Sequence, residues 1–345
     1  MKNLFLFSLL LHIFFISCSK ENISQGQTDW LIPVNEVRDG GPGKDGIPSI
    51  DNPQFIRIDQ VDFLSDNDLV VGMVHNNVVR AYPHPIMDWH EIVNDELGNL
   101  EVALTYCPLT GTAVAWNRKN NGQSTTFGVS GKLFNTNLMP YDRDSDSYWS
   151  QMSLNCVNGD RIGEVIETFP IIETTWATWK SMYPNSEILS TQTGFSRNYN
   201  RYPYGDYRTN NNNVIFPVSP RDTRLPSKER VLAVLNETVN RVYSINLFEN
   251  PRVIYDQIGD DPIIVIGAKD ENFIVAFRNQ GLNDWTVDLT KLPVIATDNE
   301  GNELDINGRI VAGPLAGTQL DHPTAYIGFW LSFGAFYPGI EIYVE

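Results

Sequence analysis

The chain has 345 residues, with 42 acidic and 25 basic side chains, and carries a formal net charge of −17. Apolar residues make up 42% of it and charged residues 19%, a globular composition that excludes a wholly disordered or fibrous chain. Because nucleic-acid binding needs a basic surface, the negative charge argues against a nucleic-acid partner. The length is sufficient for two domains.

The first eighteen residues predict export and lipid attachment. A short basic start leads into an apolar run over residues 4–16, which is too short to span a bilayer and is typical of a secretory signal peptide. Ser17-Cys18 ends this run as in a bacterial lipobox, although Phe15 stands where Leu is usual. We expect Cys18 to carry the lipid and to anchor the protein at the cell envelope, in the outer membrane of a Gram-negative bacterium.

The remaining sequence contains an internal similarity that predicts two copies of one module. A shift of 161 residues places 55–116 on 216–277 without a gap, and a shift of 154 places the segment at Trp176 on that at Trp330. Two similar blocks in the same order favour an internal duplication. The identical pairs include Arg80/Arg241, Tyr82/Tyr243, Asp95/Asp256 and Val78/Val239.

We predict an α+β fold of two β-rich modules of related structure, each ending in a short helix. Short runs of branched residues between Asn, Pro and Gly favour strands. Thr174 or Thr175 can cap a helix over residues 176–183 that Pro184 ends. The expected divisions are a signal peptide at 1–17, a lipidated N-terminus and tether at 18–54, module one at 55–190, a connector at 191–215 and module two, the degenerate copy, at 216–345.

Two segments of module one are lost in module two, and they contain the candidate site. His90 aligns with Pro251 and Cys107 with Ala268, so the shared fold requires neither side chain. Cys107 and Cys156, the cysteines left after lipidation, are compatible with one disulfide or two free thiols. The residues expected to line a pocket at this site are Trp89, Glu91, Tyr106 and Ser130.

A Cys/His pair is compatible with three roles. Thiolate and imidazole bind soft or borderline ions such as copper and zinc, with Cys107, His90 and His84 as the ligands, and this is our first expectation. Alternatively, Cys107 is the nucleophile of a thiol enzyme and His90 is its base. In the third role, Cys107 has no chemical function and is a buried apolar residue of a non-catalytic binding or scaffold lipoprotein. Further candidate ligands or orienting groups are His75, Asp88, Glu91 and Asn94.

Several motifs resemble one known family. They occur in the order Gly43–Pro48, Trp89–Asp95, Thr105–Ala113, Phe127–Gly131, Tyr141–Arg143 and Trp149–Gln151. Together they are similar to a bacterial and archaeal family of exported proteins, domain of unknown function 3179, from about residue 40 to the C-terminus. The resemblance implies no activity. Many members resemble Cys-Pro-Leu-Cys where this chain has Cys107 to Thr110, so Thr110 replaces a second cysteine.

Overall fold

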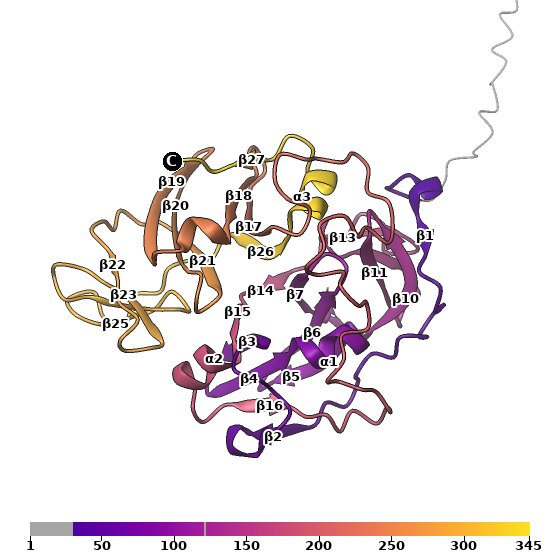
Figure 1. The fold of residues 1–345 in the computed structure, drawn as a ribbon, viewed down its shortest axis with the longest axis horizontal. Helices are drawn as coiled ribbons and strands as arrows, with labels where there is room; N and C mark the ends of the chain where they lie inside the picture. The colour runs from indigo at the N-terminus through magenta and orange to yellow at the C-terminus, as the bar shows by residue number, and fades with distance from the viewer. Residues whose placement is uncertain (1–29, 121) are drawn as a thin grey trace, which may run out of the picture.

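The computed structural model describes residues 30–120 and 122–345. The predicted signal peptide and the lipidation site at Cys18 lie outside these residues. No helix within the described ranges is long and apolar enough to cross a membrane. That part of the chain folds mainly as β-sheet with three short α-helices, which confirms a β-rich α+β fold (Figure 1).

Module one contains two sheets that share one core. One has the strand order β15-β3-β4-β16-β2, with β16 parallel to β4, and the other is the antiparallel set β14-β7-β6-β5. Val71, Tyr82 and Leu104 lie in the core between them. The strand bounds are β2 (Phe55–Arg57), β3 (Leu69–His75), β4 (Val78–Pro83), β5 (Ile92–Leu97), β6 (Leu100–Cys107), β7 (Thr112–Asn117), β14 (Thr168–Phe169), β15 (Ile172–Thr175) and β16 (Glu187–Leu189).

Module two has the same order of corresponding strands. One sheet is β26-β17-β18-β27, with β27 parallel to β18, and the other is the antiparallel set β19-β20-β21. Leu232, Tyr243 and Val265 lie in its core. The strand bounds are β17 (Arg230–Leu235), β18 (Arg241–Ser244), β19 (Arg252–Ile258), β20 (Asp261–Ala268), β21 (Phe273–Arg278), β26 (Thr324–Phe329) and β27 (Glu341–Ile342).

An identical ion-pair network links the two sheets in each module. Arg80 donates to Asp95 at 2.8 Å and to Glu187 at 3.0 Å, and the Tyr82 hydroxyl donates to Asp95 at 2.6 Å. The corresponding contacts in module two are made by Arg241, Tyr243, Asp256 and Glu341. These residues are the ones that the shifts of 161 and 154 pair in the sequence.

A short helix follows the corresponding strand in each module. The Thr175 side chain accepts a hydrogen bond from the Thr178 amide at 3.2 Å and so caps α2 (Trp176–Met182), which ends before Pro184 as predicted. α3 (Trp330–Phe336) follows β26 in module two. The remaining helical segments are α1 (His84–His90) and the 3-10 turns η1 (Val34–Glu36), η2 (Ile58–Gln60) and η3 (Ile245–Phe248).

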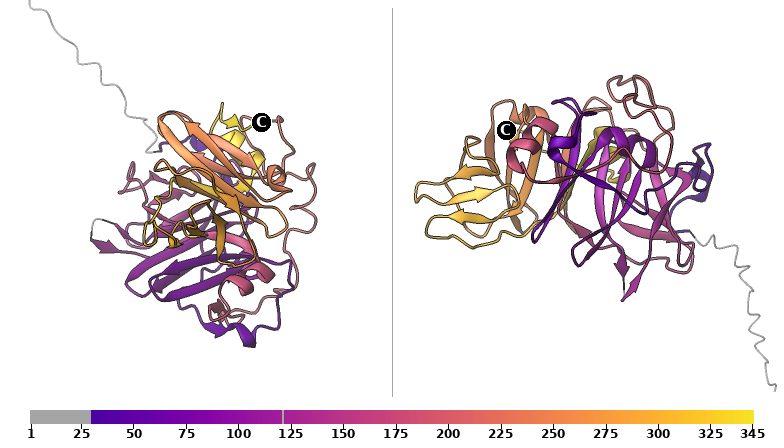
Figure 2. Two further views of the ribbon diagram at one scale, coloured as in Figure 1. Left: turned by 90° about the vertical axis from the view of Figure 1, so that its left-hand side faces the viewer. Right: turned by 90° about the horizontal axis from the view of Figure 1, so that it is seen from below.

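The two modules pack through reciprocal contacts. Trp179 of α2 belongs to a core that includes Phe273 of module two, and Phe333 of α3 belongs to a core that includes Trp116 of module one. β15 lies beside β21, and β26 lies beside β7. Both views of Figure 2 show the two modules packed against each other. The modules therefore form one body with a shared interior.

Each module also carries an added sheet. Module one has β1-β10-β11-β12-β13 and the β8–β9 hairpin, and module two has β22-β23-β24-β25. The bounds are β1 (Arg38–Asp39), β8 (Lys119–Asn120), β9 (Gln123–Ser124), β10 (Phe127–Phe134), β11 (Asn137–Asp142), β12 (Tyr148–Ser150), β13 (Asn155–Asn158), β22 (Thr286–Val287), β23 (Val294–Thr297), β24 (Glu303–Asp305) and β25 (Ile310–Ala312).

The described part of the expected tether, residues 30–54, belongs to this folded body. β1 pairs with β10, and Ile50 bridges to Val93. Gly131 of β10 permits a close approach of this segment, because a Cβ on Gly131 would lie 2.6 Å from Gly43. A glycine-rich composition indicates a flexible tether as readily as a close contact, so the sequence does not distinguish the two.

Candidate functional site

The candidate residues lie where α1 meets β5 and β6. Pro85 is accommodated in the first turn of α1, where its missing N–H is not needed. The helix ends at Glu91, whose φ of 58° is unusual for a residue with a Cβ and turns the chain into β5. The Tyr106 amide donates to the Glu91 carbonyl at 2.6 Å, which places Glu91 beside the end of β6.

Cys107 is a free, buried thiol at the end of β6. Its side chain is 1% exposed, and Sγ lies 3.7 Å from the Thr136 carbonyl oxygen. Burial, with a smaller contribution from the nearby Glu91 carboxyl, raises the pKa of the thiol to about 11. Cys156 is also free and buried, so the two cysteines left open by the sequence are not joined.

Glu91 is a buried carboxyl next to this thiol. Burial raises the pKa of Glu91 to about 8, Tyr204 opposes that rise, and the charge of Asp88 adds to it. The carboxyl is therefore mostly protonated at neutral pH. A protonated carboxyl can donate a hydrogen bond and act as a general acid.

Lys228, from the segment before β17 of module two, completes this group. Its amine is buried, lies 3.1 Å from the centre of the Tyr207 ring, and has no hydrogen-bond partner among the residues described. Burial lowers the pKa of Lys228 to about 7, and the charge of Cys107 opposes that decrease. About half of the amine is therefore deprotonated at pH 7 and available as a base.

The connector between the modules covers this group and runs beside α1 (Figure 1). The Tyr207 hydroxyl donates to the Leu109 carbonyl at 2.8 Å, and the Tyr202 hydroxyl donates to the Pro108 carbonyl at 3.3 Å. Arg208 forms an ion pair with buried Asp88 at 2.5 Å. We call the enclosed set the thiol centre: Cys107, Glu91, Lys228, Tyr204 and Tyr207.

A sequence model of the family described as "Protein of unknown function (DUF3179)" matches residues 44–340. The chain belongs to this family. The match includes both modules, the connector and every residue of the thiol centre. No curated protein and no solved structure matches the chain significantly.

The predicted partner of Cys107, His90, has other contacts in the DUF3179 fold. Nδ1 lies 2.7 Å from the Pro48 carbonyl oxygen and Nε2 lies 2.7 Å from the Tyr199 hydroxyl. Only a ring nitrogen that carries hydrogen can donate to a carbonyl, so Nδ1 is the donor and Nε2 accepts from Tyr199. Burial lowers the pKa of His90, which keeps the ring neutral. His90 thus holds the connector and the segment before β2 together.

His84 and Tyr106 belong to a second buried cluster. The two rings are 4.5 Å apart, and His84 Nε2 lies 3.6 Å from Glu173, which also forms an ion pair with Arg230. Burial alone would raise the pKa of Glu173, but Arg230 and His84 together lower it to about 2. The cluster joins module one to module two.

The other candidate residues have structural contacts. Trp89 donates to the Arg201 carbonyl of the connector at 3.1 Å. The Ser130 hydroxyl donates to the Met139 carbonyl and accepts from the Lys132 amide at 3.0 Å, which stabilises the bend of β10. Within the described residues, no group of three or more His, Cys, Asp or Glu side chains is arranged to hold a metal ion.

The sequence analysis did not identify Lys228, Tyr204 or Tyr207 as site residues. Lys228 lies in a Ser-Lys-Glu-Arg run that has the composition of an exposed turn. The connector tyrosines come from a segment with no periodic pattern. Only the packing of module two against β7, and of the connector against the turn after β6, brings these side chains to Cys107.

Proposed function

We propose that this DUF3179 protein is a lipid-anchored, extracytoplasmic enzyme that uses Cys107 for thiol chemistry. The observation that carries the proposal is the burial of a lysine amine and a protonated carboxyl beside a free thiol. Buried, unpaired ionisable groups destabilise a fold, and clusters with perturbed pKa values are typical of functional sites. In module two, Ala268 and Arg252 replace Cys107 and Glu91.

The covered thiol centre is chemically inactive. The thiol has a pKa of about 11 and the amine a pKa of about 7, so moving the proton from sulfur to nitrogen costs about 5 kcal/mol before the two charges attract. Displacing the connector would admit water, lower the thiol pKa and raise the amine pKa. The proposed enzyme therefore reacts only when the connector opens.

In the opened state, Lys228 takes the proton from Cys107 Sγ, which leaves a thiolate next to an ammonium group. The thiolate attacks an electrophilic carbon of the substrate, so that an S–C bond forms while the bond to the leaving group breaks. The ammonium of Lys228, or the carboxyl of Glu91, then supplies a proton to the leaving group. Lys228 in this scheme has the role that the sequence suggested for His90.

Metal binding at Cys107 has less support from the contacts. Both ring nitrogens of His90 already have partners, and His84 faces Glu173 in a different cluster. Metal analysis of the purified chain separates the two functions. About one copper or zinc ion per chain, lost on Cys107→Ser, would favour a metal protein over a thiol enzyme.

We further propose that the two modules arose by internal duplication. The matching strand orders and the repeated network around Arg80 and Arg241 support this origin. Each module's helix packs into the other module, so neither copy buries its apolar surfaces alone. A duplication allows one copy to acquire chemistry while the other retains the fold, in agreement with the single thiol centre.

Loosening the connector is expected to accelerate modification of Cys107. In the double variant Trp89→Phe/Tyr199→Phe, two hydrogen bonds to the connector are lost, each contributing about 1 kcal/mol. We expect alkylation of Cys107 by iodoacetamide at pH 7.5, followed by peptide mass mapping, to be about tenfold or more faster than in the wild type.

Two controls accompany this comparison. Tyr255→Phe removes a tyrosine hydroxyl bonded to the Trp285 amide in module two, far from the connector, and should not change the rate. Cys156, followed in the same digests, should react equally slowly in all variants. Equal rates at Cys107 in the wild type and the double variant would refute the idea that the connector protects the thiol.

The lipid anchor is tested by substitution of its predicted attachment site. We expect the wild-type protein to partition with membranes and the Cys18→Ala variant to be released or retained unprocessed, because the acyl chains supply the membrane affinity. Cell fractionation and the mass of the mature N-terminus measure both effects. Identical processing and membrane association of the two proteins would contradict lipidation.

A further inference from the structure

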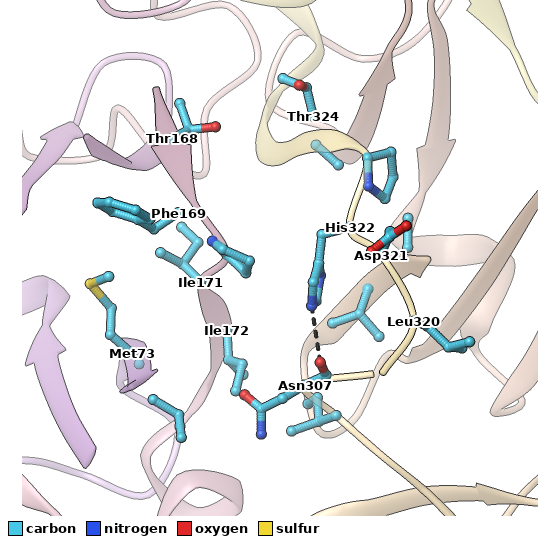
Figure 3. Close-up of a pocket in the computed structure, with 18 of the residues that line it drawn as sticks. Met73, Thr168, Phe169, Ile171, Ile172, Asn307, Leu320, Asp321, His322 and Thr324 are labelled. Carbon is cyan, nitrogen blue, oxygen red and sulfur yellow. Dashed lines mark hydrogen bonds between the residues drawn. The ribbon is translucent and has the colours of Figure 1, made fainter. Parts of the chain in front are cut away.

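A cleft between the two modules lies apart from the thiol centre. Its volume is about 560 Å³, which is within the range of small-molecule sites, and such sites are frequent at domain interfaces. One wall comes from β3, β14 and the residues up to β15 of module one. The other comes from β21 and the segment before β26 of module two. Figure 3 shows His322 and Asn307 facing Ile171 and Ile172 across the gap.

The walls of the cleft combine polar side chains with a smaller apolar area. Met73 and Ile172 are buried at its base, and Phe169 and Ile171 are only half-buried on the module-one side. Apolar area left open at such a gap favours a ligand with an apolar body, since covering it contributes about 25 cal/mol per Å².

The polar groups at the cleft include both hydrogen-bond donors and acceptors, and the acceptors are at His322 and Asp321. His322 Nε2 lies 2.9 Å from the Asn307 carbonyl oxygen, so Nε2 carries the hydrogen and Nδ1 is an acceptor. The Gln319 amide nitrogen also donates to the Asn307 carbonyl, at 2.8 Å. Asp321 is exposed at the rim. Among the described residues that line the cleft there is no Lys or Arg.

We propose that this cleft binds a small molecule with an apolar body and one hydroxyl or amine group, and that it excludes carboxylates and phosphates. The half-buried Phe169 and Ile171 side chains contact the apolar body of the ligand, and the acceptors at His322 and Asp321 accept a hydrogen bond from its donor group. An anion would meet the Asp321 carboxylate with no cation to neutralise it. Because none of these residues belongs to the thiol centre, the site is independent of the proposed chemistry at Cys107.

Three probes that share one aromatic body test this site: 1-naphthalenemethanol, 1-naphthalenemethylamine and 1-naphthoic acid. We expect the purified full chain to bind the alcohol and the amine at least tenfold more tightly than the acid in calorimetric titrations. Ile171→Trp and, separately, Thr324→Trp fill the cleft from opposite walls and should each weaken binding at least tenfold. Ile162→Trp, on an exposed loop, is the matched control and should leave binding unchanged.

Three results would overturn the proposal. These are the absence of binding by any probe, equal binding of the acid, and wild-type binding in both cleft-filling variants. Unfolding curves show whether Ile171→Trp or Thr324→Trp fails to fold. If one of them does, the binding measured for the other tests the proposal. Cys107→Ser should bind the alcohol as the wild type does, so failure at the thiol centre and failure at the cleft are distinguishable.

Discussion

Replacing Lys228 with methionine is expected to stabilise the protein at pH 7 by about 3–4 kcal/mol. The lysine amine is buried against the Tyr207 ring without a hydrogen-bond partner among the described residues, and its pKa is lowered by burial to about 7. A pKa about 3 below the ordinary value corresponds to about 4 kcal/mol of unfavourable free energy in the folded state. Methionine fills a similar volume without a charge.

The pH dependence of stability provides a sharper signature of Lys228. Between pH 7 and pH 10.5 the unfolded chain binds this proton and the folded chain does not, so stability increases with pH across that window. Below pH 7 both states bind it, and the penalty is constant. Lys228→Met removes this increase, so the difference between variant and wild type should shrink from pH 7 to pH 10.

Urea unfolding at several pH values measures both effects. Lys119→Met, at an exposed lysine, is the matched control and should change stability by less than about 0.5 kcal/mol at every pH. A Lys228→Met protein that is less stable than the wild type, with an unchanged pH profile, would show that Lys228 has a charged partner and is a structural residue.

Removal of Arg230 is expected to have the largest destabilising effect. Arg230 forms an ion pair with Glu173, which is 5% exposed, and Arg230→Met leaves that carboxylate with only His84 nearby. Breaking a buried pair by removing one partner destabilises by about 3–5 kcal/mol. The double variant Arg230→Met/Glu173→Leu should recover most of this loss, because no uncompensated charge remains.

The acid limb of the stability curve tests the same pair. Glu173 has a folded-state pKa of about 2 against an ordinary value of 4.5, so its contribution is complete above pH 4.5 and is lost as the pH falls toward 2. In Arg230→Met this loss should begin at higher pH. Arg57→Met breaks an exposed pair with Asp59 and should cost under 1 kcal/mol. Equal losses in Arg230→Met and Arg57→Met would contradict a buried pair.

The strands and the end helix of each module could be predicted because their signals are local. Val70–Val74 and Val78–Tyr82 are branched runs on either side of an Asn turn, and Asn76 adopts the φ of 52° that such a turn requires. Thr175 caps the start of α2 and Pro184 prevents its continuation, and both effects depend only on neighbouring residues.

α1 and the thiol centre could not be predicted because their causes are not local. Pro85 and the strand-forming residues before His84 give no sequence signal for a helix. The helix is followed by Glu91, whose unusual φ the sequence does not indicate. The module comparison does identify Cys107 as a residue that the fold does not require. Its proposed partner Lys228 lies 121 positions away and is buried only because module two docks against β7.

If Lys228 and Cys107 act together, as we claim, the pH dependence of Cys107 alkylation must change when the lysine amine is removed. The rate is measured from pH 6 to pH 10 in Trp89→Phe/Tyr199→Phe, with and without Lys228→Met. The ammonium of Lys228 should stabilise the thiolate, so the rate with Lys228 present should level off at a pH about one unit or more below that of the Lys228→Met protein. Superimposable profiles in the two proteins would contradict the claim.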